Sequence, residues 1–277
     1  MIKTGILTDH QPDDKQLRQL RQIERLEISA VQTILPARSD EQTERITQVI
    51  RSSDLIYTDM KQPPAKLIRL ILRNSRHLFF REIPRLSMQE ISGLIRLEEE
   101  AGSISQIFLP LLYLPENLKQ LRELHPPLLA DFRLQAIPQV SLTRLLLDKL
   151  LLLAVLKPGP VKKTEVNSLE QGTENHVTDI RISFSSGTTV RFLLATCFPC
   201  KEPVAEFFRA GRAPLVLPAG KMHAAKRQRA VHQALKELLL ALDHRPSVLI
   251  SFDELYQAQQ MIRQIREKLE LRGSRLL

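Results

Sequence analysis

The first 115 residues alternate between strand-like and helix-like hydrophobic patterns, and this alternation limits the possible folds more than any other feature. Short apolar runs at Lys3–Thr8, Glu27–Leu35, Asp54–Thr58 and His77–Phe80 are separated by segments with apolar residues at helical spacing. Strands joined by helices of this length form right-handed crossovers and a parallel sheet. The pattern therefore predicts an α/β domain with a doubly wound, Rossmann-like sheet, in which Ile107–Leu111 is the fifth strand.

One helix of this half has complete start and stop signals. Ser87 is a good N-cap, Glu90 stands three residues later as in a capping box, and Gly102 follows the last apolar position. The spacing predicts a helix over 87–102.

The pattern changes after residue 115. Leu142–Leu156 is a strongly apolar helix, and Val177–Phe184 and Thr188–Thr196 alternate apolar and polar residues around the hairpin signal Ser185-Ser186-Gly187. Such alternation indicates an antiparallel sheet with one covered face. We expect two domains: residues 1–115, and an α+β domain over 116–277 with a mostly antiparallel open sheet. The last helix, Phe252–Leu271, could return to the first domain.

Composition limits the remaining classes. No apolar run approaches the roughly 20 residues that span a bilayer, and no apolar signal segment opens the chain, so we expect a cytoplasmic protein. The two cysteines, Cys197 and Cys200, have CxxC spacing but no second pair to complete a zinc site. We interpret them as ordinary thiols and expect no metal.

The net charge of +9 suggests binding to nucleic acid or another polyanion. The charge is dispersed over helices, aromatic residues make up 5% of the chain, and tryptophan is absent. The sequence therefore offers no evident platform on which bases could stack. This class remains an alternative, based on two basic groups: Lys221, Lys226, Arg227 and Arg229, and Arg263, Arg266, Arg272 and Arg275.

Five stretches, in order, resemble the glucose-fructose oxidoreductase and inositol dehydrogenase family. They are Asp54-Leu-Ile-Tyr-Thr58, His77-Leu-Phe-Phe-Arg-Glu-Ile-Pro84, Leu97-Glu-Glu-Glu-Ala-Gly102, Leu147-Asp148-Lys-Leu-Leu-Leu152 and Phe252-Asp-Glu-Leu255. The resemblance spans nearly the whole chain. It implies a Rossmann domain that binds NAD or NADP, followed by a domain whose open sheet commonly forms the oligomer interface.

The sequence departs from the family at each functional position. A pyrophosphate cradle needs a glycine turn, but only Gly5 precedes the first turn, which carries Asp9, Asp13 and Asp14. No acid for the ribose hydroxyl ends the second strand, where Arg38 is the nearest charged residue. In the resemblance, the proton-transfer lysine falls on Glu82 or Ile83, and the catalytic histidine falls on Leu145.

These departures lead to three hypotheses. The leading one is a non-catalytic dehydrogenase-like protein without a cofactor, with a structural, binding or regulatory role, which forms a homo-oligomer through the C-terminal sheet. Its vestigial site candidates are Glu82 and Asp148 for catalysis and Gly5, Thr8 and Thr58 for the cofactor. The alternative is an active NAD(P)-dependent oxidoreductase on a sugar, polyol or similar small substrate, with a site rearranged around Asp59, Lys61, Glu82 and Asp148. The third is the polyanion-binding module.

Overall fold

The chain divides into two compact units in a computed structural model. The model describes residues 1–34, 40–135, 141–171, 175–195, 204–209, 211, 213–218 and 222–271. The first unit comprises Met1–Tyr113 and Arg227–Tyr256, and the second comprises Leu114–Lys226 and Gln257–Leu277. The sequence placed the domain boundary at 115 and left open a return of the last helix to the first domain, and in the structure Arg227–Tyr256 belongs to the first unit. Among the described residues, no helix is long and apolar enough to cross a membrane.

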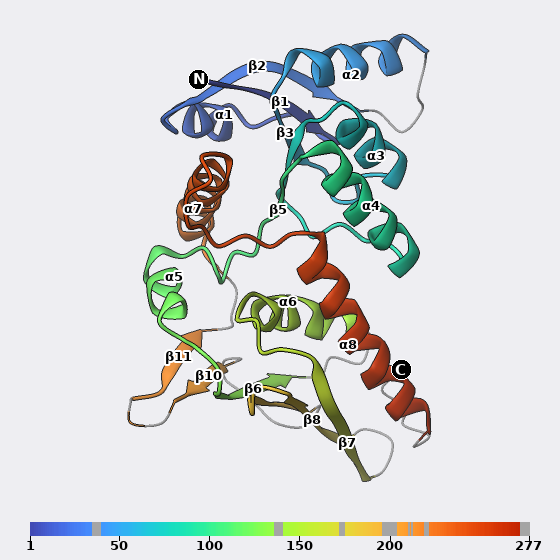
Figure 1. Cartoon of the computed structure of the whole chain (residues 1–277), viewed down its shortest axis with the longest axis vertical. Coiled ribbons are helices and arrows are strands. Elements are labelled where there is room, and N and C mark those ends of the chain that lie inside the picture. The colour runs from blue at the N-terminus through green and yellow to red at the C-terminus, as the bar shows by residue number, and fades with distance from the viewer. Residues whose placement is uncertain are drawn as a thin grey trace. The chain divides into compact units, whose positions relative to one another are not determined.

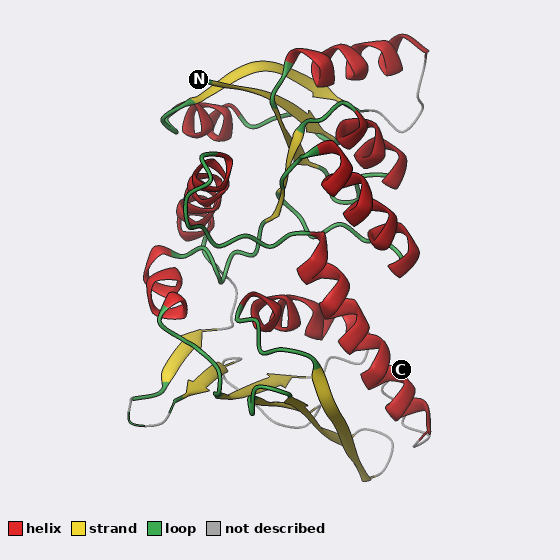
Figure 2. Cartoon of the chain, in the orientation of Figure 1, coloured by secondary structure: helices red, strands yellow, loops and turns green. Residues whose placement is uncertain are grey.

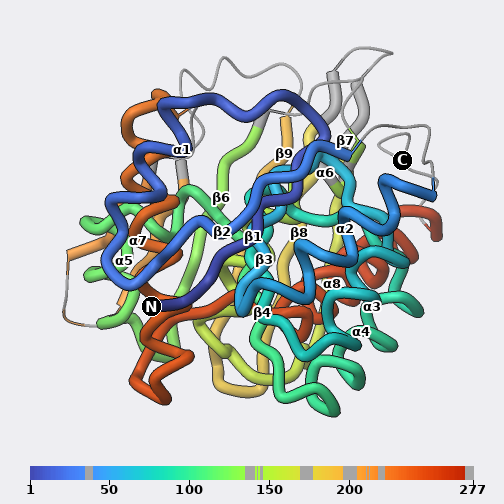
Figure 3. Tube along the Cα trace, turned by 90° about the horizontal axis from the view of Figure 1, so that it is seen from above, coloured from blue at the N-terminus to red at the C-terminus, as the bar shows by residue number. Residues whose placement is uncertain are grey.

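The first unit is a doubly wound sheet, as the alternating pattern predicts (Figure 1). Its five strands lie in the order β2-β1-β3-β4-β5, and every neighbouring pair is parallel. Helices α2, α3 and α4 lie on one side of the sheet and α1 and α7 on the other (Figures 1 and 3). The elements are β1 (Ile2–Thr8), α1 (Asp14–Arg21), β2 (Leu26–Thr33), α2 (Asp40–Ser52), β3 (Leu55–Asp59), α3 (Ala65–Arg73), β4 (His77–Phe80), α4 (Met88–Ala101), β5 (Ser105–Ile107) and α7 (Ala224–Leu242).

Local signals explain how α4 begins and ends. The hydroxyl of Ser87 accepts a hydrogen bond from the Glu90 N–H, and the Glu90 carboxylate accepts one from the Ser87 N–H. Gly102 ends the helix in the left-handed conformation, with φ 60°. The predicted capping box and glycine stop are therefore confirmed.

The fifth strand is shorter and earlier than the sequence suggests. β5 covers Ser105–Ile107 rather than Ile107–Leu111, because the chain turns immediately afterwards, where the Leu112 N–H donates to the Leu109 carbonyl at 3.0 Å. The apolar residues of this turn, including Phe108 and Tyr113, are buried. Because the turn is buried, its residues are mostly apolar, and this apolar run was predicted as a strand.

The second unit is built on a six-stranded sheet in the order β11-β10-β6-β9-β8-β7. β6 and β9 are parallel and the other neighbours antiparallel, which confirms a mostly antiparallel sheet. Helices α6 and α8 cover one face, and no described helix covers the other (Figure 2). The elements are α5 (Pro115–Arg122), β6 (Leu129–Gln135), α6 (Leu142–Val155), β7 (Val161–Gln171), β8 (Asn175–Phe184), β9 (Thr189–Ala195), β10 (Val204–Phe208), β11 (Leu215–Pro218) and α8 (Phe252–Leu271).

The predicted hairpin is present in this sheet. β8 and β9 are antiparallel neighbours, and Gly187 takes the positive φ of 84° that their turn requires. The sequence analysis did not identify β6, β10 or β11. β6 has alternating burial, with Ala130 and Phe132 buried and Asp131 and Arg133 on the outer face.

Candidate functional site

The carboxyl ends of the parallel strands carry a connected group of polar side chains. Asp59 is the last residue of β3, Arg81 directly follows β4, and Gln16 lies in the first turn of α1. Gln16 Nε2 donates to Asp59 Oδ2 at 2.8 Å, and Arg81 Nη1 donates to Gln16 Oε1 at 2.8 Å. Arg81 also forms an ion pair with Asp59, and the Tyr57 hydroxyl accepts from Gln16 Nε2 at 3.4 Å. Open α/β sheets bind ligands at this edge.

The turn between β1 and α1 joins the same group through a histidine. The Nε2 of His10 lies 3.5 Å from Asp59 Oδ2, and its Nδ1 lies 2.9 Å from Asp9 Oδ1. Asp9 also accepts from the Lys61 N–H at 3.0 Å, which fixes the turn against the loop after β3. Burial alone would raise the pKa of Asp9, but the hydrogen bonds from His10 and Lys61 lower the pKa below its ordinary value. We call His10, Gln16, Tyr57, Asp59 and Arg81 the carboxyl-edge cluster.

Burial and charge set the protonation of two members. Tyr57 is enclosed in the sheet and stacks on Phe79, and burial raises the pKa of its hydroxyl. The Tyr57 hydroxyl therefore stays protonated and can donate a hydrogen bond. Burial would lower the pKa of Arg81, but the nearby Asp59 and Glu82 carboxylates favour the charged form, and that pKa is raised overall. Arg81 is a permanent cation at this edge.

Helix α7 brings a second arginine to the cluster. Arg227 Nη2 forms an ion pair with Glu82, the residue after Arg81. Arg227 also acts electrostatically on the Tyr57 hydroxyl. A helix more than 140 residues away in the sequence therefore contributes to this edge of the first unit.

The first turn does not fit a pyrophosphate held in the usual way. Asp13 caps α1, and its carboxylate accepts the Lys15 N–H at 2.9 Å, so a negative charge occupies the end of the helix that would hold a phosphate. Gly5 is buried in the middle of β1. A Cβ there would meet Ser53 Oγ at 2.6 Å and Val49 Cγ1 at 2.7 Å, so its small size serves the packing of β1 against α2.

Several sequence-based candidates lie at this edge. Thr8 ends β1, where its hydroxyl contacts the backbone of His10, and Asp59, Lys61 and Glu82 follow on the neighbouring strands. Lys61 is exposed and contributes its backbone N–H, and Glu82 pairs with Arg227. The structure therefore brings together most of the residues named for the rearranged site.

Two other candidates lie elsewhere. The Thr58 hydroxyl donates to the Phe79 carbonyl at 3.0 Å inside the sheet, so it joins β3 to β4. Asp148 lies on α6 in the second unit and pairs with Lys149 at 2.7 Å.

Other sequence-based predictions concern residues that lie outside the described ranges or are only partly described. Arg38, Cys197, Cys200, Lys221, Arg272 and Arg275 lie outside the described ranges, and Leu145 is described only as part of α6. In the remaining basic groups, Arg263 pairs with Glu267 at 2.8 Å and Arg266 donates to Thr143 at 3.1 Å, while Lys226 and Arg229 are exposed.

Sequence reasoning named Asp59 but missed the other four members of the carboxyl-edge cluster: His10, Gln16, Tyr57 and Arg81. It named Arg227 only as part of a basic group that could bind a polyanion. Position could have identified two of them, because Arg81 directly follows the fourth strand and His10 lies two residues after the end of the first. Gln16 and Arg227 required the helices α1 and α7 to be placed on the sheet, which no local pattern provides.

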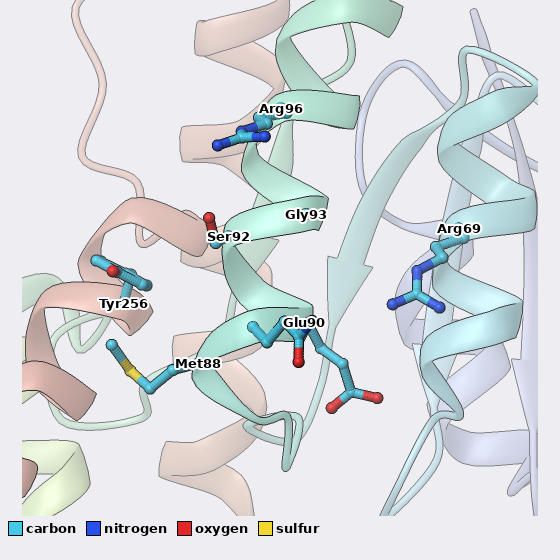
Figure 4. A pocket seen from close by; sticks show the side chains of 8 residues that line it. Arg69, Met88, Glu90, Ser92, Gly93, Arg96 and Tyr256 are labelled. Carbon is cyan, nitrogen blue, oxygen red and sulfur yellow. The ribbon is translucent and has the colours of Figure 1, made fainter.

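A separate pocket of the first unit lies along α4 and has a volume of about 690 Å³. Figure 4 shows Met88, Ser92 and Arg96 along α4, with Tyr256 of α8 beside them and Arg69 of α3 opposite Glu90. No member of the carboxyl-edge cluster lines it. The pocket is a surface feature distinct from the candidate site.

A doubly wound unit followed by a unit with an open, mostly antiparallel sheet is the architecture of NAD(P)-binding oxidoreductases of the resembled family. A probable dehydrogenase from Thermotoga maritima matches 98% of this chain and 97% of its own, at 12% identity and a TM-score of 0.72. UDP-N-acetylglucosamine 3-dehydrogenase from Acidithiobacillus ferrooxidans matches 96% and 97%, at 12% identity and a TM-score of 0.66. Biliverdin reductase from Synechocystis, in complex with biliverdin and NADP⁺, matches 96% and 98%, at 12% identity and a TM-score of 0.57.

The resemblance stated from the sequence is thus confirmed at the level of the fold. No protein-family model and no curated protein matches the sequence.

The expectation of a non-catalytic protein is wrong in the light of these neighbours. Two of them are named as dehydrogenases and one as a reductase, so they favour the alternative of an active oxidoreductase. The expectation rested on family residues missing from their usual positions. The structure places other polar residues, His10, Asp59 and Arg81, at the edge of the sheet where this fold binds ligands.

Proposed function

We propose that this chain is an NAD(P)-dependent oxidoreductase that acts on a sugar, polyol or similar small polar substrate through a rearranged site. The observation that carries the proposal is the carboxyl-edge cluster, in which Asp59 is shared by His10, Gln16 and Arg81. Its place at the carboxyl ends of β1, β3 and β4 is where a doubly wound sheet binds nucleotides and substrates. The fold shared with named dehydrogenases supports the same reaction class.

Each member of the cluster suits a role toward a polar substrate. His10 is half exposed, and its imidazole can accept and return a proton while Asp59 orients it. The Arg81 guanidinium, which is partly exposed, can donate hydrogen bonds to substrate oxygens, while Gln16 and the buried Tyr57 hydroxyl hold Asp59 and Arg81 in place. The first turn has no glycine and carries the Asp13 cap, so a cofactor here would bind with its phosphates displaced from the end of α1.

The test begins with cofactor binding. NADH and NADPH are titrated into the protein and followed by nicotinamide fluorescence, to which a chain without tryptophan contributes little background. Turnover is then followed at the nicotinamide absorbance with a panel of sugars and polyols. Absence of binding of both cofactors at millimolar concentration would contradict the proposal.

A variant pair assigns the reaction to the cluster. His10→Gln is expected to lower kcat/KM by about a hundredfold or more, the usual effect of removing a general acid–base group. The matched control is His223→Gln, because His223 is exposed and outside the cluster. Equal activities of the two variants would remove His10 from the mechanism.

We also propose that two copies associate through the outer face of the six-stranded sheet. One row across this face reads Glu206, Asp131, Arg191, Arg181 and Glu165 in register. A twofold axis through the sheet would place the acidic end of this row, Glu206 and Asp131, of one copy against Arg191 and Arg181 of the other. Leu129 and Val216, 46% and 52% exposed, add apolar area to the same sheet. Sedimentation velocity tests this, and a monomer at all concentrations would contradict it.

A further inference from the structure

Two arginines meet at the carboxyl end of β4, and each is paired with one carboxylate. Arg81 pairs with Asp59, and Arg227, from the first turn of α7, pairs with Glu82. The pairs are adjacent, because Glu82 also acts on the charge of Arg81 and both guanidinium groups act on the Tyr57 hydroxyl. We call Arg81 and Arg227 the arginine pair.

The arginine pair retains unused donors. A guanidinium has five N–H donors. In the described part of the chain, the hydrogen bonds of Arg81 to Asp59 and Gln16 both use Nη1, and the bond of Arg227 to Glu82 uses Nη2. The Nε of Arg227 is buried without a hydrogen-bond partner among the described residues. A buried donor without a partner costs free energy, which an incoming acceptor would recover.

Exposure shows which partner can give way. The Asp59 side chain is only 9% exposed and is also bound by Gln16, whereas the Glu82 side chain is 44% exposed and forms its described ion pair with Arg227 alone. Glu82 can therefore move into water at little cost, and Arg227 is 38% exposed and reachable from solvent. The planar fork of arginine suits carboxylate and phosphate groups equally.

The charges around the first turn direct an anion to the same place. Asp9, Asp13 and Asp14 surround the amino end of α1, so a ligand with a negative group is repelled there. Lys61 after β3 is an exposed cation at this edge, and the two arginines lie on the β4 and α7 side.

We infer that the arginine pair is an anion subsite, which holds a phosphate or carboxylate group of the bound ligand after Glu82 releases Arg227. The inference rests on the proposed function and deepens it, because it assigns a negatively charged group to the cofactor or substrate at this edge. The two sources share one chemistry, and the experiment separates them.

The experiment uses the full chain and isothermal titration with four probes: NADPH, inorganic pyrophosphate, glucuronate and glucose. The variants are Glu82→Gln, which frees Arg227, and Arg227→Gln, which removes it. The matched control is Arg25→Gln, since Arg25 forms an ion pair with Asp243 in the same unit but precedes β2, at the amino edge of the sheet. Circular dichroism checks that each variant is folded.

The expected result is that Arg227→Gln weakens binding of the anionic probe about tenfold, the usual effect of one charge-assisted hydrogen bond. Glu82→Gln tightens it, because the competing carboxylate is gone, and the neutral glucose is unaffected by either change. Changes for NADPH and pyrophosphate assign the anion to the cofactor, and changes for glucuronate assign it to the substrate. If Arg227→Gln does not fold, the tightening in Glu82→Gln decides alone.

Three results would overturn the subsite: variants that bind every anionic probe as the wild type does, an equal effect of Arg25→Gln, or a wild type that binds none of these anions. The proposed function is judged separately. It survives if the wild type binds NADPH while the variants do not alter binding, and it fails if the wild type binds neither NADH nor NADPH, even where pyrophosphate or glucuronate binds at the arginine pair.

Discussion

The two units each carry a network of arginines and acids, and the networks differ in burial and shape. In the first unit, Arg81 and Asp59 are 23% and 9% exposed, and their bonds converge on one edge of a sheet. In the second unit, Arg181 and Arg191 share Asp179 on an open face, where the arginines are 51% and 40% exposed. Burial makes a charge costly to leave unpaired, so the first network constrains its geometry more strongly. Residue type alone therefore does not distinguish a binding site from a solvated surface.

The largest difference is expected when one arginine is removed from each network. Arg81→Met leaves Asp59 nearly buried without its cation and should lower the free energy of unfolding by about 3 kcal/mol. Arg191→Met removes an exposed partner of Asp179 and should cost less than about 1 kcal/mol, since Arg181 remains. Urea unfolding followed by circular dichroism measures both. Equal losses would show that the two networks do not differ in the way their burial indicates.

The second prediction concerns Glu98, a carboxyl of the first unit that has no cation in its described contacts. Burial raises the pKa of Glu98 to about 7 from 4.5, the polar groups of Ser105 nearby oppose this, and the charges of Asp253 and Glu254 add to it. The folded state then binds a proton that the unfolded state releases between these pH values. The contribution of Glu98 to the free energy of unfolding is therefore largest below pH 4.5. It falls as the pH rises to about 7 and is constant above that.

Glu98→Gln should remove most of this fall, on the order of 3 kcal/mol, and stabilise the protein at pH 8 relative to the wild type. A residual fall is expected from Asp253, whose pKa is also raised by burial and by Glu254 and Glu99. Urea unfolding from pH 4.5 to 8.5 provides the measurement, with the exposed Glu100→Gln on the same helix as the control. An unchanged slope in Glu98→Gln would mean that Glu98 is charged in the folded state.

The sequence predicts the first unit better than the second because its signals are local. Periodicity and the Ser87 cap identify β1 to β4 and α4 from neighbouring residues alone. β10 and β11 are short strands of four or five residues, and their antiparallel pairing is decided by contacts that no local pattern records.

The candidate site divides in the same way. Asp59 and Glu82 were found because they follow predicted parallel strands, while Gln16 and Arg227 reach the site from helices whose placement depends on tertiary packing. Gly5, kept as a vestigial cofactor candidate, depends on tertiary packing in the same way. The close approach of Val49 and Ser53 requires a residue without a side chain there.

Arg191→Met is expected to have the smallest effect on the free energy of unfolding and the clearest effect on dimer formation. Arg191 lies in the middle of the charged row, opposite Asp131 on β6 and Arg181 on β8. In a dimer formed by this face it would meet an acid of the second copy. Arg191→Met should then weaken the dimer about tenfold while changing the free energy of unfolding of the monomer by less than about 1 kcal/mol. Sedimentation velocity at several protein concentrations measures the first quantity and dilute urea unfolding the second.

Raising the salt to 0.5 M should also weaken the wild-type dimer, because exposed charges are screened. If neither the substitution nor the salt changes the affinity of the dimer, this charged row does not hold it together. The open face of the second unit would then be solvated surface.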